Sequence, residues 1–438
     1  MIEIAAVVGA ERMAAQESSR AGNFVLRARV AARMSTKSLR QWLHHDGSAG
    51  KKLFSLDHTR VLLEDVFGEE LHLARVRSLA NGVAGVLNAS LASVAAVGRA
   101  YALLANIDRK SGVKQVDRLL SNDGVALGEV IPLWVRHVVG DTPQIVVAMD
   151  WTDFDDDDHT TLVVSLITTH GRATPLAWKT VKKSKLSKRR TGHELKMVKD
   201  LHTWLPEHVR VEWLGDRAFG YRELYELLGS LGWDYTIRFR ENIKVYESDE
   251  QSLPASAYVP ANGRALKLVG AQLTHQRFAV PAAVFVKRKG MKEAWCLATS
   301  RADADASAVV RAYSKRFTIE ETFRDTKDVT FGLGLRATHI RDAERRDRLL
   351  LIIAIAQTLL TLLGAASEAS GLDRTLKTNT VKTRTMSLLN QGLEWYASLS
   401  RGNMRPERAE LLLNAYEKIL REHKFLGQIL LFDPGEPA

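Results

Sequence analysis

Hydrophobic positions change their spacing several times along the chain, and each change predicts a different kind of secondary structure. Residues 57–122 are apolar at helical intervals and contain few clustered strand formers, so this region is predicted to be all-helical. After Pro143, short apolar runs predict three consecutive strands, at 144–150, 160–169 and 174–181. A second series should alternate helix and strand: 193–205, 209–216, 221–231 and 234–239. Three neighbouring strands followed by alternation predict an α/β core whose first strands form a meander.

The pattern returns to short strands at about 241–300, and helices resume at Ala304. The strand-rich stretch is therefore expected to be a β-rich insertion in the core. The most apolar run, Leu349–Ala366, contains Gln357 and is marginal in length for crossing a bilayer, so it is predicted to be a buried core helix. Four divisions follow: an uncertain leader (1–55), a helical domain (56–140), the core with its insertion (141–370) and C-terminal helices (371–438).

The composition narrows the class of protein. The 438 residues are 45% hydrophobic and 26% charged, which is ordinary for a globular protein and excludes a disordered chain or a fibre. Sixty-two Lys and Arg against 51 Asp and Glu leave a net charge of +11, which favours an anionic partner such as nucleic acid. A basic enzyme without a nucleic-acid partner stays open at this point. The single cysteine, Cys296, excludes an intramolecular disulfide and a Cys-rich zinc site, and a reducing cytoplasm is expected.

Two aspartates end predicted buried strands. Asp150 follows Ile-Val-Val-Ala-Met, and Asp216 follows Val-Glu-Trp-Leu-Gly. An acid at the carboxyl end of a central strand emerges at the edge of the sheet, where α/β proteins place their sites. The alternative for either residue alone is a turn or a helix cap.

A third acid lies in a basic and aromatic segment, residues 313–327. On a helix that advances about 100° per residue, Tyr313, Arg316, Glu320 and Lys327 fall within an arc of about 60°. Apolar residues such as Phe317 flank this stripe, so its charged groups require an anionic or metal-containing counterpart. The alternative is a ladder of ion pairs on an exposed helix.

Three carboxylates from distant parts of the chain suggest a two-metal site. Two divalent cations roughly 3.5–4 Å apart can activate a nucleophile and stabilise the leaving oxygen of a phosphodiester. Carboxylate oxygens are the hard ligands that Mg²⁺ prefers. This chemistry requires the fold to bring two strand ends and one helix together.

The same residues resemble those of a known enzyme family. Met-Asp-Trp-Thr at Asp150, Gly-Asp-Arg-Ala-Phe-Gly at Asp216 and Tyr-x2-Arg-x3-Glu-x6-Lys at 313–327 are similar to the motifs of bacterial insertion-sequence DDE transposases of the IS-four family. The similarity in order and spacing covers roughly residues 60–370. It implies a ribonuclease-H-like catalytic core that is interrupted by the β-rich insertion, preceded by an all-α DNA-binding domain and followed by C-terminal helices.

The resemblance also implies roles for single residues. Asp150, Asp216 and Glu320 would hold two Mg²⁺ ions, with Mn²⁺ able to substitute. Tyr313, Arg316 and Lys327 would contact phosphates at the transposon end. Trp295 would stack on a base that flips out during hairpin formation; its alternative is a half-buried tryptophan of the sheet.

Other basic residues are candidates for DNA contacts. The run 182–190 contains no acid and suits a loop that tracks phosphates without reading sequence: Lys182, Lys183, Lys185, Lys188, Arg189 and Arg190. Arg99, Lys114 and Arg118 lie near predicted turns of the helical region. For each of these residues the alternative is a solvated surface.

The function expected from these observations is cut-and-paste DNA transposition. The residue chemistry alone supports metal-dependent attack on a phosphodiester. The resemblance implies cleavage of double-stranded DNA at terminal inverted repeats through a hairpin intermediate and transfer of the ends into target DNA. The helical domain would recognise the repeats, and the C-terminal helices would contribute to a homodimer in a synaptic complex. Two alternatives remain: a related metal-dependent nuclease without strand transfer, and a non-catalytic DNA-binding derivative.

Overall fold

The computed structural model describes residues 55–422, apart from 90, 155–156, 169–170, 248–251, 328–333, 336–337 and 339. The predicted leader therefore lies outside the described residues except for Ser55, and so do residues 423–438. By its contacts, Leu53–Ala438 forms one compact unit. The predicted divisions at 140 and 370 within this unit stay predictions.

Residues 56–139 form helices and their connections. The helices are α4 (Leu56–Phe67), α5 (Leu73–Asn88), α6 (Val94–Ala105), α7 (Arg109–Leu120) and α8 (Leu127–Val139). Asp108 starts α7, because its carboxylate accepts hydrogen bonds from the backbone N–H groups of Lys110 and Ser111. Helices α6 and α7 approach closely at two glycines: a Cβ on Gly98 would lie 2.4 Å from the Cα of Val113. Small residues thus allow this helix pair to pack backbone to backbone.

Helix α8 was not singled out by the sequence pattern. It joins the helical region to the sheet, since it packs on both α4 and β3, and the indole of Trp134 donates to the carbonyl of Pro175. Pro132 is the sixth residue of this helix, past its first turn, so its missing N–H removes one backbone hydrogen bond of the helix.

The core is an eight-stranded mixed sheet in the order β3-β2-β1-β4-β5-β12-β11-β8. Its strands are β1 (Gln144–Thr152), β2 (His159–Leu166), β3 (Thr174–Lys182), β4 (Arg210–Gly215), β5 (Asp234–Phe239), β8 (Leu266–Val269), β11 (Ala282–Val286) and β12 (Trp295–Thr299). The first three strands form the predicted antiparallel meander, and β4 and β5 run parallel to β1. The strands predicted between 144 and 239 are therefore confirmed, with ends shifted by a few residues.

The β-rich stretch at 241–300 is only partly a separate body. Strands β12, β11 and β8 extend the main sheet beyond β5, whereas β6 (Lys244–Tyr246), β7 (Ser252–Pro254), β9 (Gln272–Leu273) and β10 (Phe278–Ala279) form a second, four-stranded sheet. The main-chain groups of β5 on that side pair with β12, so the insertion covers an edge that would otherwise be exposed.

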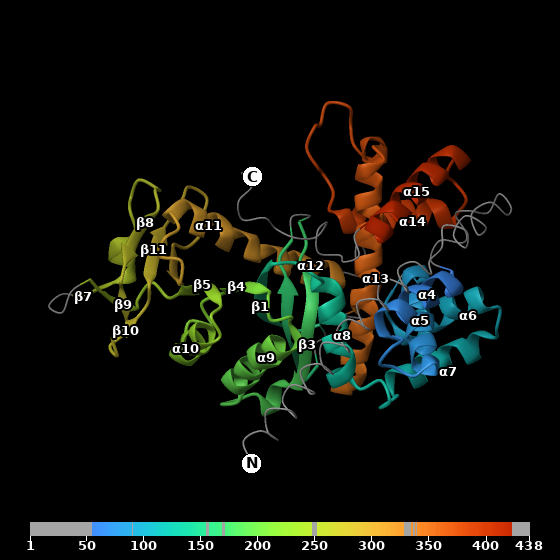
Figure 1. The fold of residues 1–438 in the computed structure, drawn as a ribbon, viewed down its shortest axis with the longest axis horizontal. Helices are drawn as coiled ribbons and strands as arrows, with labels where there is room; N and C mark the ends of the chain where they lie inside the picture. Colours follow the sequence, from blue (N-terminus) through green and yellow to red (C-terminus); the bar gives the residue numbers. More distant parts are fainter. Residues whose placement is uncertain are drawn as a thin grey trace, which may run out of the picture. The chain divides into compact units, whose positions relative to one another are not determined.

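Further helices pack on the sheet or on one another and complete the unit (Figure 1). They are α9 (Arg190–Trp204), α10 (Arg222–Ser230), α11 (Ala306–Ser314), α12 (Thr318–Lys327), α13 (Ala343–Ala369), α14 (Leu388–Ser400) and α15 (Pro406–Glu422). Short 3₁₀ turns occur at η1 (Lys183–Lys185), η2 (Ala255–Tyr258), η3 (Lys315–Phe317) and η5 (Leu372–Leu376).

Helix α13 is long and apolar enough to cross a membrane, but its most apolar stretch is entirely buried inside the protein. It packs against α5 and α7, against β3, and against α14 and α15 (Figure 1). Asp347 at its start accepts hydrogen bonds from the backbone N–H of Thr180 in β3, at 3.0 and 3.2 Å. As the sequence indicated, this segment is a buried core helix.

Candidate active site

Asp150 and Asp216 come from neighbouring parallel strands. Strands β1 and β4 pair in a register that sets Met149 opposite Gly215, and each aspartate is the next residue along its chain. Main-chain groups fix both carboxylates: one oxygen of Asp150 accepts from the N–H of Trp151 at 2.8 Å, and one of Asp216 accepts from the N–H of Ala218 at 2.7 Å. The turn role considered for Asp216 is thus present together with its proximity to Asp150.

Arg316 connects the third acid to this pair. Its guanidinium lies 2.7 Å from Oε1 of Glu320 and 3.6 Å from Oδ2 of Asp150. The Arg316 side chain is only 6% exposed, whereas that of Glu320 is 49% exposed. One buried cation therefore brings the acid of α12 to the end of β1.

The pKa of Asp150 also shows that Asp216 and Glu320 are near enough to act on its carboxyl group. The pKa of Asp150 is raised to about 6, chiefly by burial, with Arg316 opposing the rise and the charges of Asp216 and Glu320 adding to it. Like charges that raise the pKa of one carboxyl are typical of sites built to bind a cation or to share a proton.

The donor set fits a hard divalent cation. Three carboxylates from β1, the residue after β4 and α12 supply the oxygen ligands that Mg²⁺ prefers, and the charges of Asp216 and Glu320 near Asp150 add negative potential that a cation would offset. Among the residues that the structure describes, however, no group of three or more His, Cys, Asp or Glu stands close enough together to hold one metal ion. Arg316 provides the positive charge between Asp150 and Glu320.

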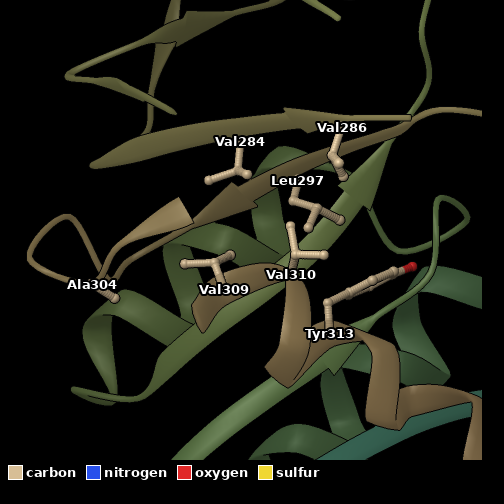
Figure 2. Packing of buried hydrophobic residues seen from close by; sticks show 7 residues of the cluster. All are labelled: Val284, Val286, Leu297, Ala304, Val309, Val310 and Tyr313. Carbon is tan, nitrogen blue, oxygen red and sulfur yellow. The ribbon is translucent and has the colours of Figure 1, made fainter. Parts of the chain in front are cut away.

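The segment 313–327 differs from the single regular helix on which its stripe was predicted. A 3₁₀ turn, η3, separates α11 from α12, and a 3₁₀ turn advances about 120° per residue, so the arc of about 60° does not hold. Tyr313 is 1% exposed and belongs to an apolar cluster with Val284, Val286 and Leu297. Figure 2 shows its hydroxyl directed away from these valines.

Tyr313 and Arg316 are thus packed beneath the surface. Burial raises the pKa of Tyr313 to about 12, and Arg316 lies 5.9 Å from its ring centroid. Lys327, at the end of α12, lies 5.7 and 5.9 Å from the rings of Phe154 and Phe323. Contact of these three side chains with DNA phosphates stays a prediction.

Trp295 begins β12 and belongs to an aromatic group beside Arg316. Its ring stacks on Phe317, with centroids 5.7 Å apart, and meets Tyr313 edge-on at 5.0 Å. Trp295 is half-buried, and Phe317 is 37% exposed. The indole therefore already has an aromatic stacking partner in the structure.

Helix α12 is attached to the core through the connection between β2 and β3. The hydroxyl of Thr322 accepts from the N–H of Ala173 at 2.8 Å and donates to its carbonyl at 3.0 Å. Arg172 forms an ion pair with Asp325, with 2.6 Å between Nε and Oδ2. These side-chain contacts set where Glu320 lies relative to the strands.

Two further groups near the aspartates were missed by the sequence. Glu194 of α9 is buried and accepts hydrogen bonds from the indole of Trp151 and the hydroxyl of Tyr221. Glu293 accepts from both Arg217, at 3.0 Å, and Arg238, at 2.7 Å. The spacing of these acids does not distinguish them from surface residues, because all their partners except Arg190 lie far away along the chain, and Arg190 and Glu194 have the spacing of an ordinary helical ion pair.

The basic run 182–190 forms the end of β3, the turn η1 and the start of α9. Lys182, Lys185, Lys188, Arg189 and Arg190 are exposed. Two members have internal partners: Lys183 pairs with Asp153 at 3.0 Å, and Arg190 with Glu194 at 3.2 Å. In the helical region, Arg99 on α6 and Lys114 and Arg118 on α7 are exposed.

The chain was also compared with known proteins. Residues 178–359 match the model of a family described as the transposase DDE domain, and the matched range contains Asp216 and Glu320 but begins after Asp150. No curated protein matches the chain. The match supports a DDE transposase.

Proposed function

We propose that this protein is a DNA transposase that cleaves at transposon ends and joins them to target DNA, with Asp150, Asp216 and Glu320 as its catalytic carboxylates. The observation that carries the proposal is the position of Arg316, whose guanidinium contacts both Asp150 and Glu320. Asp216 lies beside Asp150, because the two residues directly follow the paired residues Met149 and Gly215 of adjacent strands. A protein that only binds DNA has no need for acids at two adjacent strand ends and a third acid that pairs with the same arginine as the first.

The three acids would hold two Mg²⁺ ions, and Mn²⁺ would substitute. When bound, the metal supplies Lewis acidity and an activated water for attack on a phosphodiester. Asp150 and Asp216 keep one oxygen each on a main-chain N–H, which fixes the carboxylates before a ligand arrives. Glu320, more exposed, would face the DNA side of the site.

The strand order β3-β2-β1-β4-β5, with an antiparallel meander followed by parallel strands, supports a ribonuclease-H-like core. The hairpin intermediate, the cut-and-paste pathway and strand transfer are part of the same proposal. Their support is the resemblance of the three motifs, and Trp295 is the aromatic residue proposed to stack on the flipped base. That role requires Trp295 to exchange the Phe317 ring for the base.

DNA would be the partner of three surfaces. The exposed members of the run 182–190 would track phosphates, Arg99, Lys114 and Arg118 would contact the terminal repeats, and Lys327 and Arg316 would approach the scissile strand. Residues after 370 would contribute to a homodimer through the faces of α14 and α15 that do not pack on α13. The proposed place of action is the bacterial cytoplasm, on the nucleoid.

The test is a cleavage assay on DNA that carries the element's terminal repeats, with Mg²⁺ or Mn²⁺. Glu320→Gln keeps the size of the side chain and removes its charge, and Glu321→Gln, the next residue on α12, is the matched control. Losing one metal ligand removes several kcal/mol of transition-state stabilisation, so Glu320→Gln should lower the rate by about 10²–10³-fold. Glu321→Gln should stay near the wild-type rate.

The products separate the alternatives. Hairpins and strand-transfer products support the transposase, and cuts without transfer would instead identify a nuclease. Binding to terminal-repeat DNA without metal-dependent cuts would identify a DNA-binding derivative. Equal cleavage by wild type and Glu320→Gln would contradict the assigned carboxylates.

A further inference from the structure

Glu194 is a buried carboxylate whose partners come from both strand-end segments of the candidate site. Its side chain, on α9, is 2% exposed. Oε1 accepts from the indole Nε1 of Trp151 at 2.7 Å, and Oε2 accepts from the hydroxyl of Tyr221 at 2.8 Å. The Nε of Arg190 donates to Oε1 at 3.2 Å.

The two neutral donors are closely tied to the two aspartates. Trp151 directly follows Asp150 in β1, and its backbone N–H donates to the Asp150 carboxylate. Tyr221 ends the turn that begins at Asp216: the N–H of Phe219 donates to the carbonyl of Asp216, and the N–H of Tyr221 donates to the carbonyl of Phe219. One carboxylate thus joins the residue after the first aspartate to the turn after the second.

The energetics favour a specific role over incidental packing. A buried carboxylate is costly unless several donors satisfy it, and removal of one partner leaves the remaining groups unpaired. Glu194 has three donors, and burial together with its negative charge raises the pKa of Tyr221. The phenol therefore stays a donor to this carboxylate over the physiological range of pH.

We propose that Glu194 is a positioning residue of the metal site, which holds Trp151 and Tyr221 so that Asp150 and Asp216 keep the separation needed to bind divalent cations. This inference rests on the proposed function, since it assigns Glu194 a role toward that metal. Groups that orient metal ligands typically contribute about 10–100-fold to metal affinity.

The test measures Mn²⁺ binding to the full-length protein by isothermal titration calorimetry, well below the unfolding temperature. Glu194→Gln should raise the Mn²⁺ dissociation constant by about 10-fold or more. Tyr221→Phe removes only the donor oxygen and should cause a smaller rise. Both changes break the same hydrogen bond between Tyr221 and Glu194, so the double variant Glu194→Gln/Tyr221→Phe should raise the dissociation constant by less than the product of the two single effects. The matched control is Glu226→Gln, on α10, where an exposed acid pairs with Arg222.

The outcomes distinguish positioning from general stabilisation. If Glu194 only stabilises the fold, Glu194→Gln and Tyr221→Phe will lower the unfolding temperature and leave the Mn²⁺ affinity at the wild-type value, which overturns the inference. Should Glu194→Gln fail to fold, Tyr221→Phe decides by the same criterion. Asp150→Asn is measured in parallel: unchanged Mn²⁺ affinity in that variant would overturn the proposed function itself, whereas loss in Asp150→Asn with no change in Glu194→Gln overturns only the positioning role.

Discussion

The two aspartates and the glutamate of the candidate site are held in different ways. Asp150 and Asp216 belong to adjacent strands whose register is fixed by main-chain hydrogen bonds and whose carboxylates accept further main-chain N–H groups. Glu320 belongs to α12, a ten-residue helix whose attachment to the β2–β3 connection depends on Thr322 and on the Arg172–Asp325 ion pair.

Because the aspartates and the glutamate are held by different contacts, substitutions at the two sides of the site should have different effects. On the strand side, main-chain hydrogen bonds fix both carboxylates, and Glu194 is the side chain that links the two strand-end segments. On the helix side a few side chains decide whether Glu320 reaches Asp150. Variants of the two sides should therefore show which contacts keep the three acids in place.

The largest effect is expected on the helix side, for Arg172→Met. The change leaves Asp325, whose side chain is 11% exposed, without its close cation. Removing one partner of a buried ion pair costs about 3 kcal/mol or more, and the displacement of Glu320 should lower the cleavage rate as well. Urea unfolding and the cleavage assay measure the two effects.

The control for Arg172→Met is Arg324→Met. Arg324 pairs with Glu321 on the exposed face of the same helix, so its loss should cost less than about 1 kcal/mol. Similar losses of stability in the two variants would mean that the Arg172 pair does not anchor α12.

The next effect is on the pH dependence of stability and concerns Asp347, which bonds to strand β3 of the sheet. Burial raises the pKa of Asp347, which anchors α13 to β3, from its ordinary value of 3.8 to about 6. The folded state then binds the proton more tightly than the unfolded state, so the stabilisation is full below about pH 4 and is lost as the pH rises through about 6. The loss is about 3 kcal/mol.

Asp347→Asn keeps an oxygen to accept from Thr180 and removes the charge. The variant should therefore gain stability relative to wild type between about pH 4 and 7, with little change in the cleavage rate per folded molecule. Urea unfolding across this range measures the difference. A stability difference that does not vary with pH would contradict the assignment of the shifted group.

A smaller effect is expected for Thr322→Val on the helix side. The valine keeps the volume but cannot bond to the N–H and carbonyl of Ala173, which should cost about 1–2 kcal/mol. Amide hydrogen exchange in α12 should increase. Thr361→Val in α13 loses only a bond to the Gln357 carbonyl of its own helix, so protection there should change less.

The sequence predicts the strand side of the site better than the helix side. The run before Asp150 is apolar without interruption, and the strand before Asp216 is apolar apart from Arg210 and Glu212, so both positions could be predicted, as could the meander of the first three strands. The joining of β12 to β5 could not, because strand pairing over such a distance leaves no local pattern. Helical periodicity placed Tyr313 and Glu320 on one stripe, but η3 breaks that helix and Tyr313 packs into an apolar cluster. Glu194 gave no signal, since its donors Trp151 and Tyr221 are 43 and 27 residues away and its pairing with Arg190 has the ordinary spacing of a helical ion pair.

The smallest effect is on DNA affinity and concerns the basic run 182–190. Lys185 is exposed, whereas Lys183 is paired with Asp153, so Lys185→Gln should reduce affinity more than Lys183→Gln. Each phosphate contact that is lost should flatten the slope of log affinity against log salt by about 0.9. Fluorescence anisotropy with unrelated duplexes measures both slopes. Equal slopes for wild type and Lys185→Gln would exclude Lys185 from the interface.

The most direct measurement is an anomalous-difference map from crystals of the protein with terminal-repeat DNA and Mn²⁺. The account predicts anomalous peaks about 2.0–2.2 Å from carboxylate oxygens of Asp150 and Asp216, with Glu320 completing the ligands. Peaks bound by other residues, or a complex with ordered DNA in which these three carboxylates hold no ion, would contradict it.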